Sequence, residues 1–262
     1  MQALQPLLSP SRIQFPMPRY FLQLSFNGTH YHGWQLQENA HTVQAEINRA
    51  LITLLKHPTK TAGCGRTDTG VHARTFFAHF ETPATIEDDT DFLHHLNCIL
   101  PKDIAVQRLI PVEVTQHARF AATSRTYEYY LHQKKNPFLN DSSYFFPIHT
   151  DIDKMNKAAQ LLLGQNDFSS FSKSRTQVNH FNCHITEAQW FQSAEQLMFR
   201  ISADRFLRSM VRTIVGTLLD VGEGKISEGD FRKIIEGKSR REAGTAVPAH
   251  GLYLVDVKYP FL

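Results

Sequence analysis

Residues 62–73 read Ala62-Gly63-Cys64-Gly65-Arg66-Thr67-Asp68-Thr69-Gly70-Val71-His72-Ala73. The glycines of this stretch can take left-handed turns and let another molecule approach the backbone closely. A guanidinium, Arg66, and a carboxylate, Asp68, lie two positions apart between them. The apolar residues that follow alternate as in a half-buried strand, at Phe76, Ala78 and Phe80. The stretch therefore predicts a charged loop anchored by regular structure, which is typical of a functional site.

The same pattern also fits an ordinary tight turn. In such a turn Asp68 would accept hydrogen bonds from its own backbone, and short motifs often match by chance. The remainder of the chain has to decide between a turn and a site.

The length and composition of the chain set broad limits on its class. Its 262 residues suit one large domain or two small ones with a sizeable core. The formal net charge is +3, which is compatible with a nucleic-acid partner but does not by itself indicate one. The cysteines form no C-x-x-C pair, and the histidine pairs have no further ligand at metal spacing, so we expect neither disulfides nor a bound metal.

The N-terminal residues and the apolar runs bear on location. No apolar run approaches the length of a membrane span, so we expect no membrane partner and a reducing, cytoplasmic location. Residues 1–18 contain four prolines and no hydrophobic core of a signal peptide. We therefore expect a disordered tail, with ordered structure beginning near Arg19.

Hydrophobic periodicity predicts two successive α/β halves of similar plan. In the first half we expect strands at 20–26, 76–80 and 104–109 and helices at 43–55, capped by Thr42, and at 89–100. In the second we expect strands at 125–133, 184–191, 196–203 and 252–259 and helices at 153–163, 206–221 and 227–236. Such halves are typical of duplicated ferredoxin-like (RRM-like) units with their sheets side by side. We expect an N-terminal α/β domain at 19–112, which carries the loop of Asp68, and a C-terminal α/β domain at 113–262.

Three arginines, Arg205, Arg208 and Arg212, lie at the start of the predicted helix 206–221. A solvated polar face is the ordinary explanation for such a group. Cations at a helix N-terminus oppose the helix dipole, so helix stability does not explain their position. An anion such as a phosphate, or the carboxylate of Asp68, would be favoured beside them.

A tyrosine-rich strand is predicted at Ser124-Arg125-Thr126-Tyr127-Glu128-Tyr129-Tyr130. Alternation puts Tyr127 and Tyr129 on one face of the strand and Tyr130 on the other. Packing is the ordinary role of aromatic residues in strands. In an RNA-binding site such a ring can instead stack on an extruded base.

These motifs together resemble one known family. The string from Gly65 to Ala73 resembles, residue for residue, the signature of the tRNA pseudouridine synthase A family, also called pseudouridine synthase I. Four further segments are similar to motifs of that family, and all of the motifs lie along the chain in the family's order. These segments are 33–37, 116–120 with Tyr127 after it, 166–171 and 206–216. The resemblance covers nearly the whole chain from Arg19 to Tyr259. One departure is Asp204, where many relatives have Asn.

The resemblance implies a pseudouridine synthase fold with an active-site cleft between the halves, and a reaction that needs no cofactor. It implies that Asp68 is the nucleophile and that Arg212 pairs with it and keeps it ionised. Tyr127 would lie against the target uracil and assist proton removal from its C5 atom. Since the reaction takes the base out of its stack, Arg66 is placed to fill the gap or to hold the displaced phosphate.

The resemblance also implies a substrate and an assembly. The substrate would be tRNA, modified at uridines 38, 39 and 40 of the anticodon stem-loop, and the enzyme would work as a homodimer. Besides Tyr127 and Arg66, the substrate-binding residues would be Gln116, His117, Ala118, Arg119, Phe120, Lys173, Arg175, Arg205 and Arg208.

Other classes of protein fit the sequence less well. A non-catalytic RNA-binding module would lack a use for Asp68, and the RNP aromatic signature is absent. A glycoside hydrolase needs two cooperating carboxylates, and a phosphate-loop NTPase needs Gly-Lys-Ser/Thr. A pseudouridine synthase acting on another RNA remains an alternative.

Overall fold

The computed structural model describes residues 17–174, 178–193 and 196–262. Its first half contains β1 (Arg19–Phe26), α1 (Val43–Leu55), β2 (Ala62–Gly63), β3 (His72–Glu81), α2 (Asp89–Ile99) and β4 (Ile104–Val112). Its second half begins with β5 (Ser124–His132), η1 (Pro137–Leu139), β6 (Tyr144–Phe145), α3 (Ile152–Gln160) and η2 (Ser169–Phe171). It continues through β7 (Ile185–Gln192), β8 (Leu197–Ala203), α4 (Met210–Gly222), α5 (Glu228–Gly237), η3 (Ala249–Gly251) and β9 (Leu252–Lys258).

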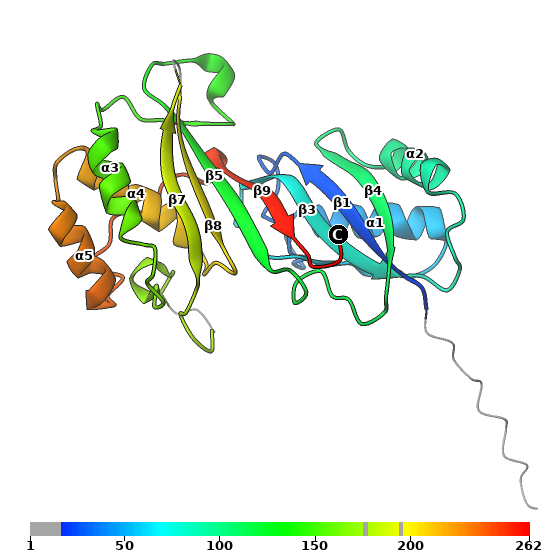
Figure 1. The fold of residues 1–262 in the computed structure, drawn as a ribbon. Coiled ribbons are helices and arrows are strands. Elements are labelled where there is room, and N and C mark those ends of the chain that lie inside the picture. The colour runs from blue at the N-terminus through cyan, green and yellow to red at the C-terminus, as the bar shows by residue number, and fades with distance from the viewer. Residues whose placement is uncertain (1–16, 175–177, 194–195) are drawn as a thin grey trace, which may run out of the picture.

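The strands form one sheet in the order β4-β1-β3-β9-β5-β8-β7, with β2 beside β3 and β6 beside β5 (Figure 1). Helices α1 and α2 lie by the first half, whereas α3, α4 and α5 lie by the second (Figure 1). The first half has the strand order β4-β1-β3-β2 and the second half the order β9-β5-β8-β7. Each is the order of a ferredoxin-like unit, fourth-first-third-second, so the predicted α/β fold is confirmed.

The shortness of β2 decides how the two halves join. β2 pairs with β3 only at His79 and Ala78. The other end of the same β3 edge is free to pair with β9, in parallel, at His72 and Ala73. The loop that follows β2, which carries Asp68, therefore lies at the junction of the two halves.

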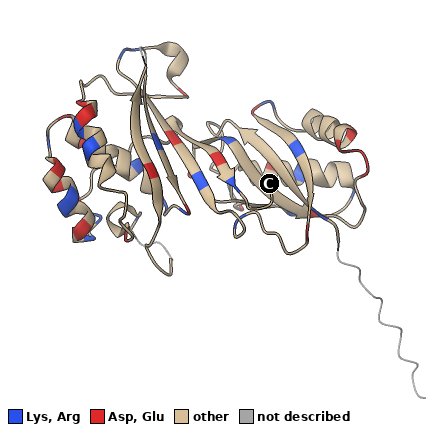
Figure 2. Cartoon of the chain, in the orientation of Figure 1, with Lys and Arg blue, Asp and Glu red and all other residues tan. Residues whose placement is uncertain are grey.

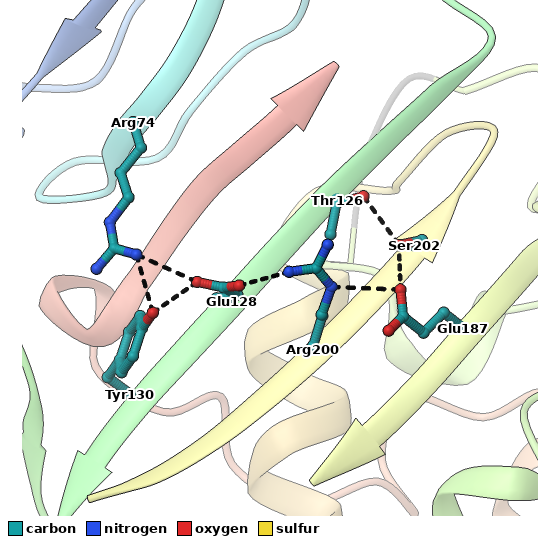
Figure 3. Close-up of polar contacts among 7 residues, drawn as sticks. All are labelled: Arg74, Thr126, Glu128, Tyr130, Glu187, Arg200 and Ser202. Atoms are coloured by element: carbon teal, nitrogen blue, oxygen red, sulfur yellow. Dashed lines mark hydrogen bonds and ion pairs between the residues drawn. The ribbon is translucent and has the colours of Figure 1, made fainter. Parts of the chain in front are cut away.

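A polar network on one face of the sheet reinforces that junction (Figure 3). The Glu128 carboxylate on β5 is buried and accepts from Arg200 on β8 at 2.7 Å and from the Tyr130 hydroxyl at 2.6 Å. Arg74 on β3 lies 3.4 Å from Glu128 and donates to Tyr130 at 3.0 Å. Strands of both halves thus share one buried carboxylate.

Two hydrophobic cores meet at the same place. The first packs β1 and β3 against α1 and α2, and the second packs β5, β7 and β8 against α3, α4 and α5. The last strand is shared, because Leu252 belongs to the second core and Leu254 to the first. Tyr127 is half-buried and packs against both.

The expected helices and longer strands are present, and the differences concern some of their ends and the short strands. Thr42 caps α1 as predicted, its side chain accepting from the Ala45 amide. Helix α4 begins at Met210 rather than at 206, because Ser209 has a left-handed backbone with φ +59°. Arg205 and Arg208 therefore precede the helix instead of standing on its face. The two-residue strands β2 and β6 have no counterpart among the predicted strands.

The terminal tail is only partly covered by the structure. Residues 1–16 of the predicted disordered tail lie outside the described residues, and Met17 and Pro18 lead into β1. In the described part of the chain, no helix combines the length and the apolar character that a membrane crossing requires.

Candidate active site

The loop that carries Asp68 is held by close backbone packing against residues 28–34. Gly33 has φ +83°, and a Cβ there would meet the Thr67 carbonyl oxygen at 2.2 Å. The Trp34 amide donates to the Thr67 hydroxyl at 3.0 Å, and the Gly70 amide donates to the Tyr31 carbonyl at 3.2 Å. Trp34 is buried, so Gly33 and Trp34 support the loop of Asp68, whereas residues 35–37 are exposed.

The Asp68 carboxylate meets three side chains that come from around the start of α4. Arg212 Nη1 donates to Oδ2 at 3.3 Å, and Ser209 Oγ donates to the same oxygen at 3.1 Å. Arg208 Nε lies 3.7 Å from Oδ1. The side chains of Asp68 and Arg212 are 24% and 20% exposed, so the pair is largely sheltered from water. Residues 141 and 144 positions apart thus form one cluster across the junction.

Arg212 is fixed by a second contact on its far side. Its Nε donates to the Val247 carbonyl at 2.6 Å, and the Val247 amide donates to the Arg212 carbonyl at 3.2 Å. The guanidinium therefore donates to the backbone through Nε and to Asp68 through Nη1.

Ser209 is a site residue that sequence reasoning missed. It occupies the N-cap position of α4, but its side chain makes no capping hydrogen bond. Its hydroxyl instead donates to Asp68. The only signal in the sequence is its position between Arg208 and Arg212 in the motif 206–216.

Tyr127 lies on β5 beside this cluster. The rings of Tyr127 and Phe206 meet edge to face, with centroids 5.0 Å apart. Burial raises the pKa of Tyr127, and the negative charge of Asp68 acts in the same direction. The hydroxyl is therefore a neutral phenol at physiological pH.

Exposed cations surround the site at a greater distance. Burial lowers the pKa of Arg119, and the charges of Arg66, Arg125 and Arg205 lower it further. Such mutual repulsion between guanidinium groups is relieved by an anion bound among them. Arg205 also contacts the 180–182 segment, with its Nη1 3.0 Å from His180 Nδ1.

The segment 116–120 is anchored through the backbone of Ala118. Ala118 is completely buried; its amide donates to His79 Nδ1 at 3.2 Å and its carbonyl accepts from the Tyr259 hydroxyl at 2.6 Å. Ala118 therefore anchors the segment instead of offering a contact surface of its own. Phe120 is 76% exposed, and the Arg119 guanidinium lies 5.6 Å from the centre of its ring.

The remaining predicted residues flank these groups. The Gln116 carbonyl accepts from Arg19 Nη1 at 2.7 Å, and the ring of His117 contacts those of His79 and Phe120. Lys173 is exposed, and its amide donates to the Arg208 carbonyl at 3.0 Å. Arg175 lies outside the described residues.

Comparison with known proteins shows the family to which this chain is similar. A family model described as tRNA pseudouridine synthase matches residues 158–260. The tRNA pseudouridine synthase A of Parabacteroides distasonis is 50% identical over 93% of this chain and 97% of its own length. The proteins of that name from Porphyromonas gingivalis and Bacillus subtilis are 48% and 39% identical over 93% and 90% of this chain, and 98% and 97% of their own lengths.

The chain belongs to the tRNA pseudouridine synthase family. The prediction of a pseudouridine synthase, which is an isomerase, is thereby confirmed.

Proposed function

We propose that this enzyme converts uridine to pseudouridine at positions 38, 39 and 40 in the anticodon stem-loop of tRNAs. The observation that supports the proposal most strongly is the contact of Asp68 with Arg212, Ser209 and Arg208 across the junction of the two halves. The names of the relatives support tRNA as the substrate. The positions within tRNA rest on the family resemblance of the motifs.

Asp68 is the nucleophile in this proposal. The reaction breaks the bond between N1 of uracil and C1′ of the ribose, joins C5 to C1′, and moves one proton from C5 to N1. Atoms and electrons balance without any oxidant or cofactor. Arg212 and Ser209 both donate to Oδ2 and so fix the orientation of the carboxylate that attacks.

Tyr127 contacts the freed uracil and assists the proton transfer. Because burial raises its pKa, its hydroxyl enters the reaction as the neutral phenol. We assign it a relay, in which the oxygen takes the C5 proton as its own proton leaves for solvent, and N1 takes up one proton from solvent. Its T-shaped contact with Phe206 sets the plane of the ring against which the base would lie.

The exposed residues around the site would hold the RNA. The charges of Arg66 and Arg205 both repel that of Arg119, so a backbone phosphate placed beside Arg119 would be favoured. Phe120, exposed beside Arg119, offers a ring on which an unpaired base can stack. A homodimer is part of the same proposal and rests on the resemblance; a monomeric mass in sedimentation at working concentration would remove it. A cytoplasmic location is also proposed, from the absence of a long apolar run and of a signal-peptide pattern in the sequence.

The decisive experiment maps pseudouridine in total tRNA and in ribosomal RNA from cells that lack this protein. We expect loss confined to positions 38–40 of tRNA, restored by the wild-type gene but not by a gene carrying Asp68→Asn. Loss in another RNA would support the alternative substrate, and an unchanged pattern in all RNAs would exclude the proposal.

A further inference from the structure

Arg125 joins three segments of the site through main-chain carbonyl groups alone. It lies near the start of β5, two residues before Tyr127. Its Nη1 donates to Ala122 at 3.1 Å and to Asp204 at 2.7 Å. Its Nη2 donates to Cys64 at 3.1 Å and to Arg119 at 2.7 Å. One guanidinium therefore satisfies four carbonyl oxygens.

Each acceptor belongs to a connection that carries site residues. Cys64 precedes the loop of Asp68, Arg119 and Ala122 belong to the 116–122 segment, and Asp204 precedes the 205–209 segment. These connections leave three different strands, β2, β4 and β8. The carbonyl groups that Arg125 contacts lie in the connections, outside the strands, so strand pairing does not hold these connections together.

The chemistry of the guanidinium suits this task. Its planar fork presents donors in fixed directions, so each carbonyl that it binds is held in distance and in angle. A lysine ammonium is a single point charge on a flexible stem and cannot reach four acceptors on three segments. The charge of Arg125 also lowers the pKa of Arg119, so it adds to the positive potential beside the site.

We propose that Arg125 is a positioning residue that sets the three connections in the single arrangement in which Asp68 meets Ser209 and Arg212. It touches none of the reacting atoms; it acts through the backbones of Cys64, Arg119 and Asp204. Only the effect of Arg125 on the reaction rate rests on the proposed function. The arrangement of the three connections is a property of the free protein.

The test compares Arg125→Lys and Arg125→Gln with a matched control, Arg200→Lys. Arg200 also bonds across strands, to Glu128 and Glu187, but within the network on the sheet and without contact to the three connections (Figure 3). Single-turnover rates and KM are measured on an anticodon stem-loop tRNA. Amide hydrogen exchange is measured on the free proteins at 64–68, 117–122 and 205–209.

We expect Arg125→Lys to lower the single-turnover rate about tenfold or more, with KM changed by less than about threefold, because small misplacements of reacting groups cost rate more than binding. Exchange should quicken in all three connections together, whereas Arg200→Lys leaves both readouts near wild type. Arg125→Gln should show a larger effect in the same direction.

Three results would overturn the inference: a rate for Arg125→Lys within about twofold of wild type, quickened exchange in only one connection, or an equal loss of rate in Arg200→Lys. Unfolding of both Arg125 variants would also overturn it, because the residue would then serve overall stability. If wild type forms no pseudouridine while exchange responds as expected, the function is wrong and the positioning stands.

Discussion

At the scale of single residues, Ser209 contacts Asp68 in a conformation that does not favour the stability of helix α4. Ser209 has a left-handed backbone, which costs a residue with a Cβ about 1–2 kcal/mol. Its hydroxyl contacts Asp68 instead of capping α4, and a capping hydrogen bond contributes roughly 1 kcal/mol. Local strain of this kind is typical of a functional site.

Replacement of Asp68 by Asn should abolish catalysis and leave the fold intact. The amide cannot act as a nucleophile, so we expect a loss of at least about a thousandfold in the single-turnover rate. Asp204→Asn is the matched control, because the Asp204 carboxylate accepts from the backbone amides of His184 and Arg205, which the oxygen of an asparagine amide can also do. Pseudouridine formation by Asp68→Asn at a rate near that of Asp204→Asn would contradict the catalytic role.

Replacement of Ser209 separates backbone strain from its contact with Asp68. Ser209→Gly and Ser209→Ala both remove the hydroxyl, but only glycine takes φ +59° without cost. We expect the glycine variant to be more stable than the alanine variant by about 1 kcal/mol in urea unfolding, and both to lose rate to a similar degree, roughly tenfold. A glycine variant with the wild-type rate would show that the hydroxyl does nothing for Asp68.

At the scale of elements, α4 and the 243–247 segment act as one unit behind the site. Gly216 on α4 lies so close to that segment that a Cβ would meet the Thr245 carbonyl oxygen at 1.9 Å. Two residues further on, the Val247 carbonyl holds Arg212. The packing of one helix against one loop thus sets the direction of the arginine that faces Asp68.

Gly216→Ala should therefore affect both stability and rate. The added methyl group displaces the 245–247 backbone, which we expect to lower the free energy of unfolding by about 1–3 kcal/mol and to slow turnover through Arg212. The control is Gly237→Ala on α5, where nothing lies within 4 Å of the new Cβ, and alanine there should be neutral or stabilising. Equal behaviour of the two variants in thermal unfolding and in turnover would refute this coupling.

At the scale of the whole molecule, two buried histidines on β3, His72 and His79, accept hydrogen bonds from the backbone of distant segments. Burial lowers the pKa of His79 to about 4, and His79 accepts from the Ala118 amide. Burial also lowers the pKa of His72, which accepts from the Gly28 amide and contacts the His250 carbonyl. Figure 2 shows that basic and acidic residues both lie on the central strands of the sheet, where the two halves join.

These histidines should make the folded protein sensitive to acid. A histidine whose pKa is lower in the folded than in the unfolded chain stabilises the fold fully above about pH 6.5, and this stabilisation is lost as the pH falls toward 4. For His79 the full loss is up to about 3 kcal/mol. We expect urea midpoints to fall between pH 6.5 and 4.5. The fall should be smaller in His79→Asn, whose side-chain oxygen can still accept from Ala118; an unchanged pH dependence in that variant would assign the acid sensitivity to other groups.

Much of the fold could be predicted because its signals are local. Alternating apolar residues along β1 and β3, the cap at Thr42 and the periodicity of α1 and α2 depend on neighbours within a few positions, so the sequence alone determined them. The motif around Asp68 likewise predicted the family, which the relatives confirm.

Only the tertiary structure decided the rest. That β2 stops after two residues and leaves the β3 edge to β9, that α4 begins at Met210, and that Ser209 and Arg125 serve the loop of Asp68 could not be derived from periodicity. The contact of Arg125 with Cys64 joins residues 61 positions apart, and that of Ser209 with Asp68 joins residues 141 positions apart. The pairing of β3 with β9 joins His72 to Tyr253, still further along the chain. Which side chains meet over such distances depends on how the two hydrophobic cores pack against each other. The local sequence pattern does not contain that information.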